Sequence, residues 1–323
     1  MRGIIATGTH LPHRRLDRAA VAAFFGKGGG TGTRTVASFD EDTTTMGAEA
    51  ARAAVASATG VDVDALWFAT ASPAYLEKTN ASAIHATLRL DASVPAFDFG
   101  GAHRSGIGAL RTALEAGPTT LVVASDSRDG LATSADESQG GDGAAALLIG
   151  DDTAGPVLAE FVGGASVTDE FLERWRVPGG DRSRTWEERF GEVVYAPLME
   201  QAWTAALADT GLVADDIHTL VVVGTHARAV ARNVGKLGVA AERIGNDLSE
   251  SVGNTGTAHP LLVLAAAIET AGPGEAIAIM ALADGVDVLV VRTTEAIGSY
   301  TPARPVASQI AGGAPIDYAK FLS

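Results

Sequence analysis

The chain has 323 residues, of which 46% are hydrophobic, and a formal net charge of −15. It can bury one large core or two joined ones, and its acidity argues against a nucleic-acid ligand because phosphate backbones carry charge of the same sign. The absence of cysteine excludes disulfides, thiolate metal sites and thiol catalysis. No apolar run approaches the roughly 20 residues of a membrane helix, and no signal-peptide pattern opens the sequence, so we expect a cytoplasmic globular protein that does not enter a membrane.

The first half of the chain contains a glycine-rich loop followed by an alanine-rich helix. The loop GKGGGTGT (26–33) lacks the Gly-Lys-Ser/Thr ending of a phosphate-binding loop, and we expect a mobile loop over the site. The helix follows the acidic run of Asp40, Glu41 and Asp42. We interpret this run as a helix start that complements the helix dipole rather than as a metal site. No group of His, Asp and Glu residues has convincing metal-ligand spacing.

Residues 97–110, FDFGGAHRSGIGAL, predict a short strand, a turn of small residues and a helix that begins at Ser105. His103 lies in the turn. The positive end of the helix dipole disfavours an imidazolium ion, so we expect a neutral His103 that acts as a hydrogen-bond donor or a proton acceptor. The alternative is that His103 only fills space at a buried turn.

Three stretches of the first half have counterparts, in the same order, in the second half. The matched pairs are 50–72 with 202–226, 112–125 with 267–281, and 141–150 with 283–292. The strands in them are near-continuous apolar runs separated by helical patterns, which predicts a mainly parallel sheet covered on both faces. We therefore predict an α/β fold built from two duplicated halves.

We place the first half at residues 1–155 and the second at residues 156–294. Residues 167–199 form a charged inserted segment that holds two of the four tryptophans, and we expect it near the site. Residues 295–323 form a proline-containing tail. Its Tyr318 and Phe321 could dock on the body of the protein or on a partner.

Several motifs of this chain resemble those of one protein family. They are DEDTTTMGAEAARAA (40–54), SPAYLEKTNASAIHATLRL (72–90), TDEFLERWR (168–176), EERFGEVVY (187–195) and VGNTGTAHPLLVLAAAIETAGPGE (252–275). Together with the duplication they resemble the thiolase superfamily, and within it the archaeal and bacterial 3-hydroxy-3-methylglutaryl-CoA (HMG-CoA) synthases, with ketoacyl synthase III as a more distant relation. The resemblance implies duplicated βαβαβ halves that form a layered α-β-α-β-α core, and a homodimer.

The resemblance also assigns roles to individual positions. In the family a cysteine in the turn before the central helix accepts the acyl group, and His103 stands at that position. The family's general base, a glutamate, corresponds to Ala71, while its histidine and asparagine correspond to His226 and Asn254. Nucleophile and base are therefore absent. The two retained residues could form an oxyanion hole for a thioester enolate, although asparagine in a GNTG loop also suits a left-handed turn without a ligand.

Arg228, Arg232 and Lys236 recur every four residues after His226, so on a helix they share one face. They suit the phosphates of coenzyme A. The alternative is a solvated surface stripe.

Two functions remain open. The first is an enzyme that takes a CoA thioester as substrate, has no covalently bound cofactor, and makes or breaks a carbon–carbon bond in an aldol or retro-aldol reaction without a cysteine acyl-enzyme. His226, Asn254 and His103 would supply the oxyanion hole and the acid or base. The second is a catalytically silent scaffold subunit, because relatives of this family associate with a thiolase and a small zinc-ribbon/OB-fold protein. The missing cysteine argues against a conventional synthase.

Overall fold

The computed structural model describes residues 1–180 and 182–323. At its centre is a nine-stranded sheet in the order β11-β12-β13-β8-β1-β7-β6-β4-β5. The first half supplies β1 (Arg2–His10), β4 (Ala65–Thr70), β5 (Ala96–Gly100), β6 (Thr120–Asp126) and β7 (Gly143–Asp151). The second half supplies β8 (Ala159–Thr168), β11 (Ile217–Gly224), β12 (Ala276–Leu282) and β13 (Gly285–Thr293). The halves meet at the β1–β8 pair, where a Cβ atom on Gly3 would lie 2.0 Å from the carbonyl oxygen of Ala159, so that only glycine fits.

The two halves place their matching strands in the same spatial order. From the centre outward, the first half has β1-β7-β6-β4 and the second has β8-β13-β12-β11. β5 extends the first half, whereas the corresponding place beside β11 holds an isolated bridge between Leu220 and Ile244. The duplicated architecture predicted from the repeats is confirmed.

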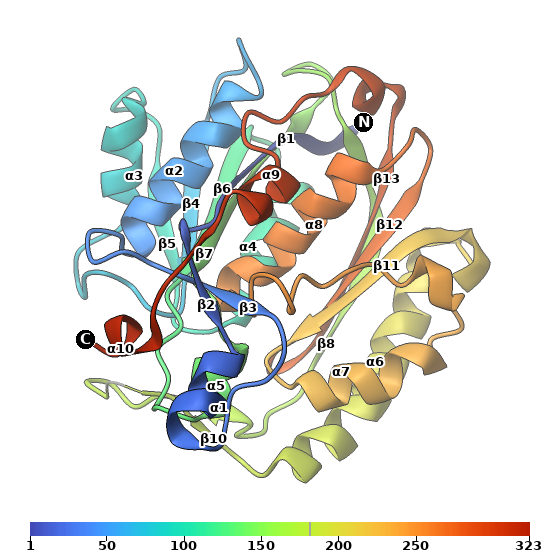
Figure 1. The fold of residues 1–323 in the computed structure, drawn as a ribbon. Coiled ribbons are helices and arrows are strands. Elements are labelled where there is room, and N and C mark those ends of the chain that lie inside the picture. Colours follow the sequence, from blue (N-terminus) through green and yellow to red (C-terminus); the bar gives the residue numbers. More distant parts are fainter. Residues whose placement is uncertain (181) are drawn as a thin grey trace.

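Helices cover the outer faces and fill the centre, as Figure 1 shows. On the outside, α2 (Thr43–Ala56) packs on β1 and β7 with α3 (Ala81–Leu88) beside it, and α6 (Glu188–Thr210) packs on β8 and β13 with α7 (Ala227–Asn233) beside it. Between the halves, α4 (Arg104–Glu115) and α8 (His259–Thr270) contact each other and strands of both halves. Ile107, Leu110 and Leu262 of this central layer are fully buried in one apolar cluster. The layered α-β-α-β-α core is therefore confirmed.

The expectation of a mainly parallel sheet is wrong. β4 runs parallel to β5 and β6, and β11 runs parallel to β12, but β7 and β13 are antiparallel to all their neighbours. The physical reason is the Asp-Gly turn: the chain reverses at Asp284, whose φ is 47°, and returns as β13 directly beside β12. A continuous apolar run indicates that both faces of a strand are buried, but it does not indicate the direction of the strand.

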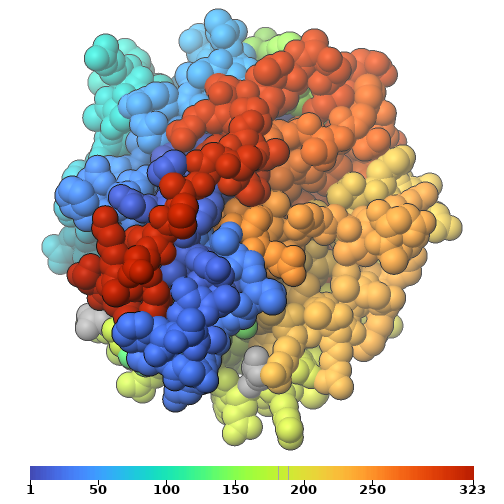
Figure 2. Space-filling view, viewed as in Figure 1, coloured from blue at the N-terminus to red at the C-terminus, as the bar shows by residue number. Residues whose placement is uncertain are grey.

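The C-terminal tail lies across the N-terminal segment, as the red and blue surfaces of Figure 2 show. Strands β2 (Arg14–Asp17), β3 (Thr33–Val36) and β14 (Ala314–Pro315) form a small sheet that joins the two. Tyr318 is 4% exposed and donates a hydrogen bond from its hydroxyl to Glu137 Oε1 at 2.7 Å, and the guanidinium of Arg34 lies 5.3 Å from the ring centre of Phe321. Both aromatic tail residues thus dock on the body of the protein.

The remaining elements are short. They are α1 (Ala19–Phe25), α5 (Ala135–Gln139), α9 (Val306–Ala311), α10 (Tyr318–Phe321), β9 (Arg174–Trp175), β10 (Arg184–Thr185) and the 3₁₀ helices η1 (Ala214–Asp216), η2 (Val234–Lys236), η3 (Ala241–Arg243), η4 (Gly256–Ala258) and η5 (Glu295–Ser299). Every helix in the described part of the chain is too short or too polar to cross a bilayer.

Candidate functional site

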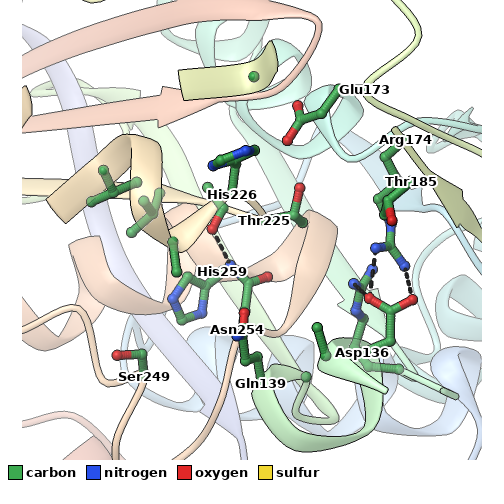
Figure 3. Close-up of a pocket in the computed structure, with 18 of the residues that line it drawn as sticks. Asp136, Gln139, Glu173, Arg174, Thr185, Thr225, His226, Ser249, Asn254 and His259 are labelled. Atoms are coloured by element: carbon green, nitrogen blue, oxygen red, sulfur yellow. Dashed lines mark hydrogen bonds and ion pairs between the residues drawn. The ribbon is translucent and has the colours of Figure 1, made fainter. Parts of the chain in front are cut away.

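A cavity of about 490 Å³ lies where loops of both halves meet beyond the ends of β6 and β11. Its walls come from the loop after β11, the loop that holds Asn254, helix α5, and residues 173–174, 185–187 and 190–191 of the charged segment. In Figure 3, His226, Asn254 and His259 lie on one side of the cavity, and Arg174 with Asp136 on the other. The cavity therefore gathers polar side chains that are far apart in the sequence.

His226 follows β11 and caps the N-terminus of α7. Its Nδ1 accepts a hydrogen bond from the backbone N–H of Ala229 at 3.1 Å, and the residue is 8% exposed. Because Nδ1 is an acceptor, the neutral ring carries its proton on Nε2. Gly191 of α6 packs closely against the ring, since a Cβ atom there would lie 2.5 Å from Cδ2 and 2.7 Å from Nε2. The backbone thus fixes both the tautomer and the position of a ring that lines the cavity.

Asn254 ties its loop to the strand that carries His226. Its Nδ2 donates to the carbonyl of Gly224 at 2.9 Å, and its Oδ1 accepts from the backbone N–H of Gly256 at 2.9 Å. The positive φ angles of this loop fall on Gly253 and Gly256, not on Asn254. The asparagine is therefore held by its amide and not by a left-handed backbone, and it lines the cavity next to His226.

His103 lies in the turn before α4, which begins at Arg104, one residue earlier than expected. It lines a neighbouring small cavity that shares Thr225, Asn254 and His259 with the large one. An Nη of Arg128 donates a hydrogen bond to its Nε2. Burial, followed by the charges of Arg128 and two further arginines, lowers the pKa of His103 well below 6.5. A neutral ring agrees with the expectation, but burial and arginine charges produce it.

One wall of the cavity carries an ion cluster of Arg128, Arg174 and Asp136. The sequence analysis did not single out these residues. Arg174 binds Asp136 through two bonds of 2.6 and 2.8 Å, and Arg128 lies 3.8 Å from the same carboxylate. Burial lowers the pKa of Arg128 to about 10. The one sequence signal for Arg128 is the segment DSRDG, which follows a buried strand. This pattern is equally typical of a polar turn.

Glu173 is a second missed residue. The hydroxyl of the fully buried Tyr195 donates to its Oε2, and the Tyr195 ring lies 6.3 Å from that of His226. Burial raises the pKa of Glu173. A partly buried carboxyl group with a raised pKa in a cavity is a candidate acid or base. The sequence predicts that the charged segment lies near the site, but it assigns no role to Glu173.

His259 is a third. It opens α8, is 2% exposed and lines both cavities. Its Nδ1 lies 3.3 Å from the backbone nitrogen of Thr255, and burial lowers its pKa to about 4. Its place five residues after Asn254 was the one available signal.

Neither Ala71 nor a residue of the glycine-rich loop is among the described residues that line the two cavities. The backbone N–H of Ala71, directly after β4, donates to Asp126 Oδ1 at 2.7 Å, and its carbonyl accepts from Arg176. Gly32 of the loop packs against the backbone of Glu250, where a Cβ atom would lie 2.1 Å from the carbonyl oxygen. In residues 1–180 and 182–323, no group of three or more His, Cys, Asp or Glu residues is arranged to hold a metal ion.

The three basic residues after His226 do not line the cavity, to which α7 contributes Ala227, Val230 and Ala231. All three are exposed. Arg232 pairs with Glu192 of α6. α7 ends at Asn233, so Lys236 lies in η2 and donates to Asn233 Oδ1 at 2.9 Å. Their role as phosphate ligands stays a prediction, and it applies to the surface outside the cavity.

Comparisons with known proteins agree with this fold. Residues 207–291 match the family model "3-Oxoacyl-[acyl-carrier-protein (ACP)] synthase III C terminal". The hydroxymethylglutaryl-CoA synthase of Archaeoglobus fulgidus is 28% identical over 100% of this chain and 98% of the relative, and that of Methanopyrus kandleri is 28% identical over 88% and 84%.

Solved structures give the same result. One of HMG-CoA synthase complexed with CoA has a TM-score of 0.81 at 17% identity and covers 100% of this chain and 90% of that one. The β-ketoacyl-[acyl carrier protein] synthase III of Thermus thermophilus has a TM-score of 0.77 at 23% identity and covers 90% and 98%. The chain is therefore similar in sequence to hydroxymethylglutaryl-CoA synthases, which are among its homologues, and it has the thiolase-like fold of the solved HMG-CoA synthase and β-ketoacyl-[acyl carrier protein] synthase III structures.

Proposed function

We propose that this protein binds an acyl-CoA thioester in the 490 Å³ cavity and makes or breaks a carbon–carbon bond without a covalent acyl-enzyme. One observation carries the proposal. His226 is fixed by the backbone with its proton on Nε2, in a cavity that also holds the partly buried carboxyl group of Glu173. A donor and a proton acceptor in one pocket meet the needs of enolate chemistry. The homology to HMG-CoA synthases supports the thioester as substrate.

The retro-aldol direction illustrates the chemistry. A base takes the proton of the 3-hydroxyl group of a 3-hydroxyacyl-CoA, and a carbonyl forms at C3 as the C2–C3 bond breaks. The electron pair moves to C2 and the thioester oxygen, where the Nε2–H of His226 stabilises the enolate. Protonation at C2 then gives a shorter acyl-CoA and an aldehyde or ketone. Glu173, whose pKa burial raises, is the base we assign, and neutral His103 is the second candidate.

The rest of the ligand would extend to the surface. The rings of Trp186 and Phe190 line the mouth of the cavity, are stacked 4.9 Å apart, and are about half exposed, so they can pack on the adenine. Arg228, Arg232 and Lys236 would bind the phosphates. We further propose that the protein is cytoplasmic and forms a homodimer. The dimer is supported by β5, which lies at the edge of the sheet and carries Phe97, 57% exposed.

The test is the cleavage of 3-hydroxyacyl-CoA thioesters of different lengths, followed by the release of acetyl-CoA. We expect His226→Ala to lower kcat/KM by about 100-fold or more, the usual effect of removing one oxyanion donor. His13→Ala is the matched control, since His13 is exposed and does not line the cavity. Equal turnover in wild type and His226→Ala would overturn the assignment.

The alternative function is a silent scaffold subunit of a thiolase and zinc-ribbon/OB-fold protein complex. The contacts of Asn254 favour this alternative. Its side-chain amide donates to the carbonyl of Gly224 and accepts from the N–H of Gly256, so it stabilises the fold without a ligand. A scaffold would form a stable complex with those partners, bind no acyl-CoA on its own and show no cleavage.

A further inference from the structure

The contact between Arg128 and His103 determines which nitrogen of the histidine ring carries the proton. An Nη of Arg128 is hydrogen-bonded to Nε2 of His103. Burial lowers the pKa of Arg128 to about 10, so its guanidinium is still charged at pH 7, and a guanidinium donates hydrogen bonds but accepts none. Nε2 is therefore the acceptor. A neutral imidazole whose Nε2 accepts a hydrogen bond carries its proton on Nδ1.

Arg128 is held in this place by contacts at both ends. Its backbone N–H donates to Asp142 Oδ1 at 2.7 Å, and its backbone carbonyl accepts from an Nη of Arg34 at 3.0 Å. Asp142 and Arg34 are buried and form an ion pair with each other at 3.2 Å. The guanidinium of Arg128 lies 3.8 Å from the carboxylate of Asp136. The donor that contacts the His103 ring is thus fixed by the fold.

These contacts prevent His103 from acting as a proton acceptor. Nδ1 carries the proton, and the lone pair of Nε2 is used by Arg128. Proton uptake at Nε2 would break that bond and place an imidazolium ion beside the charges of Arg128, Arg174 and Arg176, which act together with burial to lower the pKa of His103. The chemistry that remains for the ring is to donate a hydrogen bond from Nδ1.

We infer that Arg128 is a positioning residue that holds His103 in the Nδ1–H tautomer, and that His103 donates this hydrogen to the oxygen of the bound thioester. The inference rests on the proposed function and decides between its two candidate bases in favour of Glu173. His103 stands at the position that accepts the acyl group in the family it resembles. A donor at this position would therefore lie beside the thioester.

The two halves of the chain would then each supply one histidine donor to the developing enolate. His103 comes from the first half and offers Nδ1–H, whereas His226 comes from the second half and offers Nε2–H, because its Nδ1 accepts from Ala229. The small cavity that His103 lines shares Thr225 and Asn254 with the large cavity that His226 lines. Two fixed donors that stabilise one oxygen make up an oxyanion hole.

The first test reads the tautomer directly and needs no substrate. Protein labelled with ¹⁵N in its histidine rings is studied by NMR at pH 7, where the shift of each ring nitrogen shows whether it carries a proton. His103→Gln identifies the His103 signals by their loss. We expect His103 to be protonated at Nδ1 only. A wild-type spectrum with the proton of His103 on Nε2, or on both nitrogens, overturns the inference.

Variants of the arginine show whether it sets the tautomer. Arg128→Met removes the donor, and we expect part of the His103 population to move its proton to Nε2. Arg128→Lys keeps a donor and should keep the wild-type tautomer. Arg184→Met changes an exposed arginine that does not line either cavity and should leave the spectrum unchanged. A spectrum of Arg128→Met equal to that of wild type contradicts the positioning role.

The second test separates donation from Nδ1 from chemistry at Nε2. The amide nitrogen of asparagine is bonded to Cγ, as Nδ1 is, so His103→Asn keeps a donor close to that place. His103→Gln places its amide one atom further, where it can accept from Arg128 but does not replace the Nδ1–H. We expect His103→Gln to lower kcat/KM for thioester cleavage by about 100-fold, the usual effect of losing one oxyanion donor, and His103→Asn to lower it by about tenfold or less.

The reverse order of the two variants would assign the function of His103 to Nε2 and overturn the inference. Equal turnover of wild type and His103→Gln would exclude a donor role and also overturn it. If wild type cleaves no thioester, the proposed function itself fails, and the spectrum still decides the tautomer that Arg128 imposes on His103.

Discussion

Burial lowers the pKa of both His103 and His259, so both rings contribute to the way the stability of the protein changes with acid. Burial lowers the pKa of His259 to about 4 and that of His103 well below 6.5. In the unfolded chain both rings take up a proton near pH 6.5. Below that pH, and down to the folded pKa, the unfolded state binds more protons than the folded state, so stability falls as the pH falls.

For His259 the effect can be measured. Between about pH 7 and about pH 5, wild type should lose about 2 kcal/mol more unfolding free energy than His259→Gln, which lacks the titrating ring. Urea unfolding at the two pH values gives the difference. His13→Gln, an exposed histidine, should keep the wild-type dependence. A His259→Gln variant with the same dependence as wild type would show that the pKa of this ring is the same in the folded and the unfolded protein.

The residues that the sequence pointed to are those that follow a recognisable strand or turn. His103 and His226 are of this kind, and the loop motif marked Asn254. Glu173 lies in a run of charged residues whose pattern is the same whether one carboxyl group is buried or all are solvated. Its burial depends on Tyr195 of α6, a contact across the fold that no local pattern encodes.

At the scale of elements, α2 depends on a capping box. The Asp42 carboxylate accepts from the backbone N–H of Thr45 at 2.7 Å, and the Thr45 hydroxyl accepts from the backbone N–H of Asp42 at 2.7 Å. The acidic run was predicted to start this helix, and the structure shows which of its members forms the cap.

We predict that Asp42→Ala lowers the free energy of unfolding by about 1 kcal/mol, the usual cost of a lost N-cap. Asp40→Ala, in the same run but exposed, should change it by less than about 0.5 kcal/mol. Denaturant midpoints check both values. Equal losses in the two variants would mean that only the general acidity of the run matters.

The tail is held by a buried hydrogen bond. Tyr318→Phe leaves Oε1 of the fully buried Glu137 without its 2.7 Å donor, and we expect a loss of about 1 to 3 kcal/mol of unfolding free energy. Thermal and urea unfolding measure it, with Tyr75→Phe as the control because Tyr75 is 52% exposed. No difference between the two variants would indicate that the tail does not need this bond.

At the scale of the whole molecule, duplication brings the functional loops together. Arg128 and Asp136 come from the first half and His226 and Asn254 from the second, and they meet at one cavity. The internal repeat predicted the two halves, because it recurs in the same order along the chain. It could not predict the distance between their loops, which depends on how α4 and α8 pack in the central layer.

We propose that this cavity binds acyl-CoA without forming an acyl-enzyme. The most direct measurement incubates the protein with acetyl-CoA and glutaryl-CoA, determines binding by equilibrium dialysis, and then determines the mass of the intact protein. We predict saturable binding and an unchanged protein mass, since the chain has no cysteine and His103 is a neutral acceptor of the Arg128 hydrogen bond. A stable mass increase equal to one acyl group, or no binding of either thioester, would contradict it.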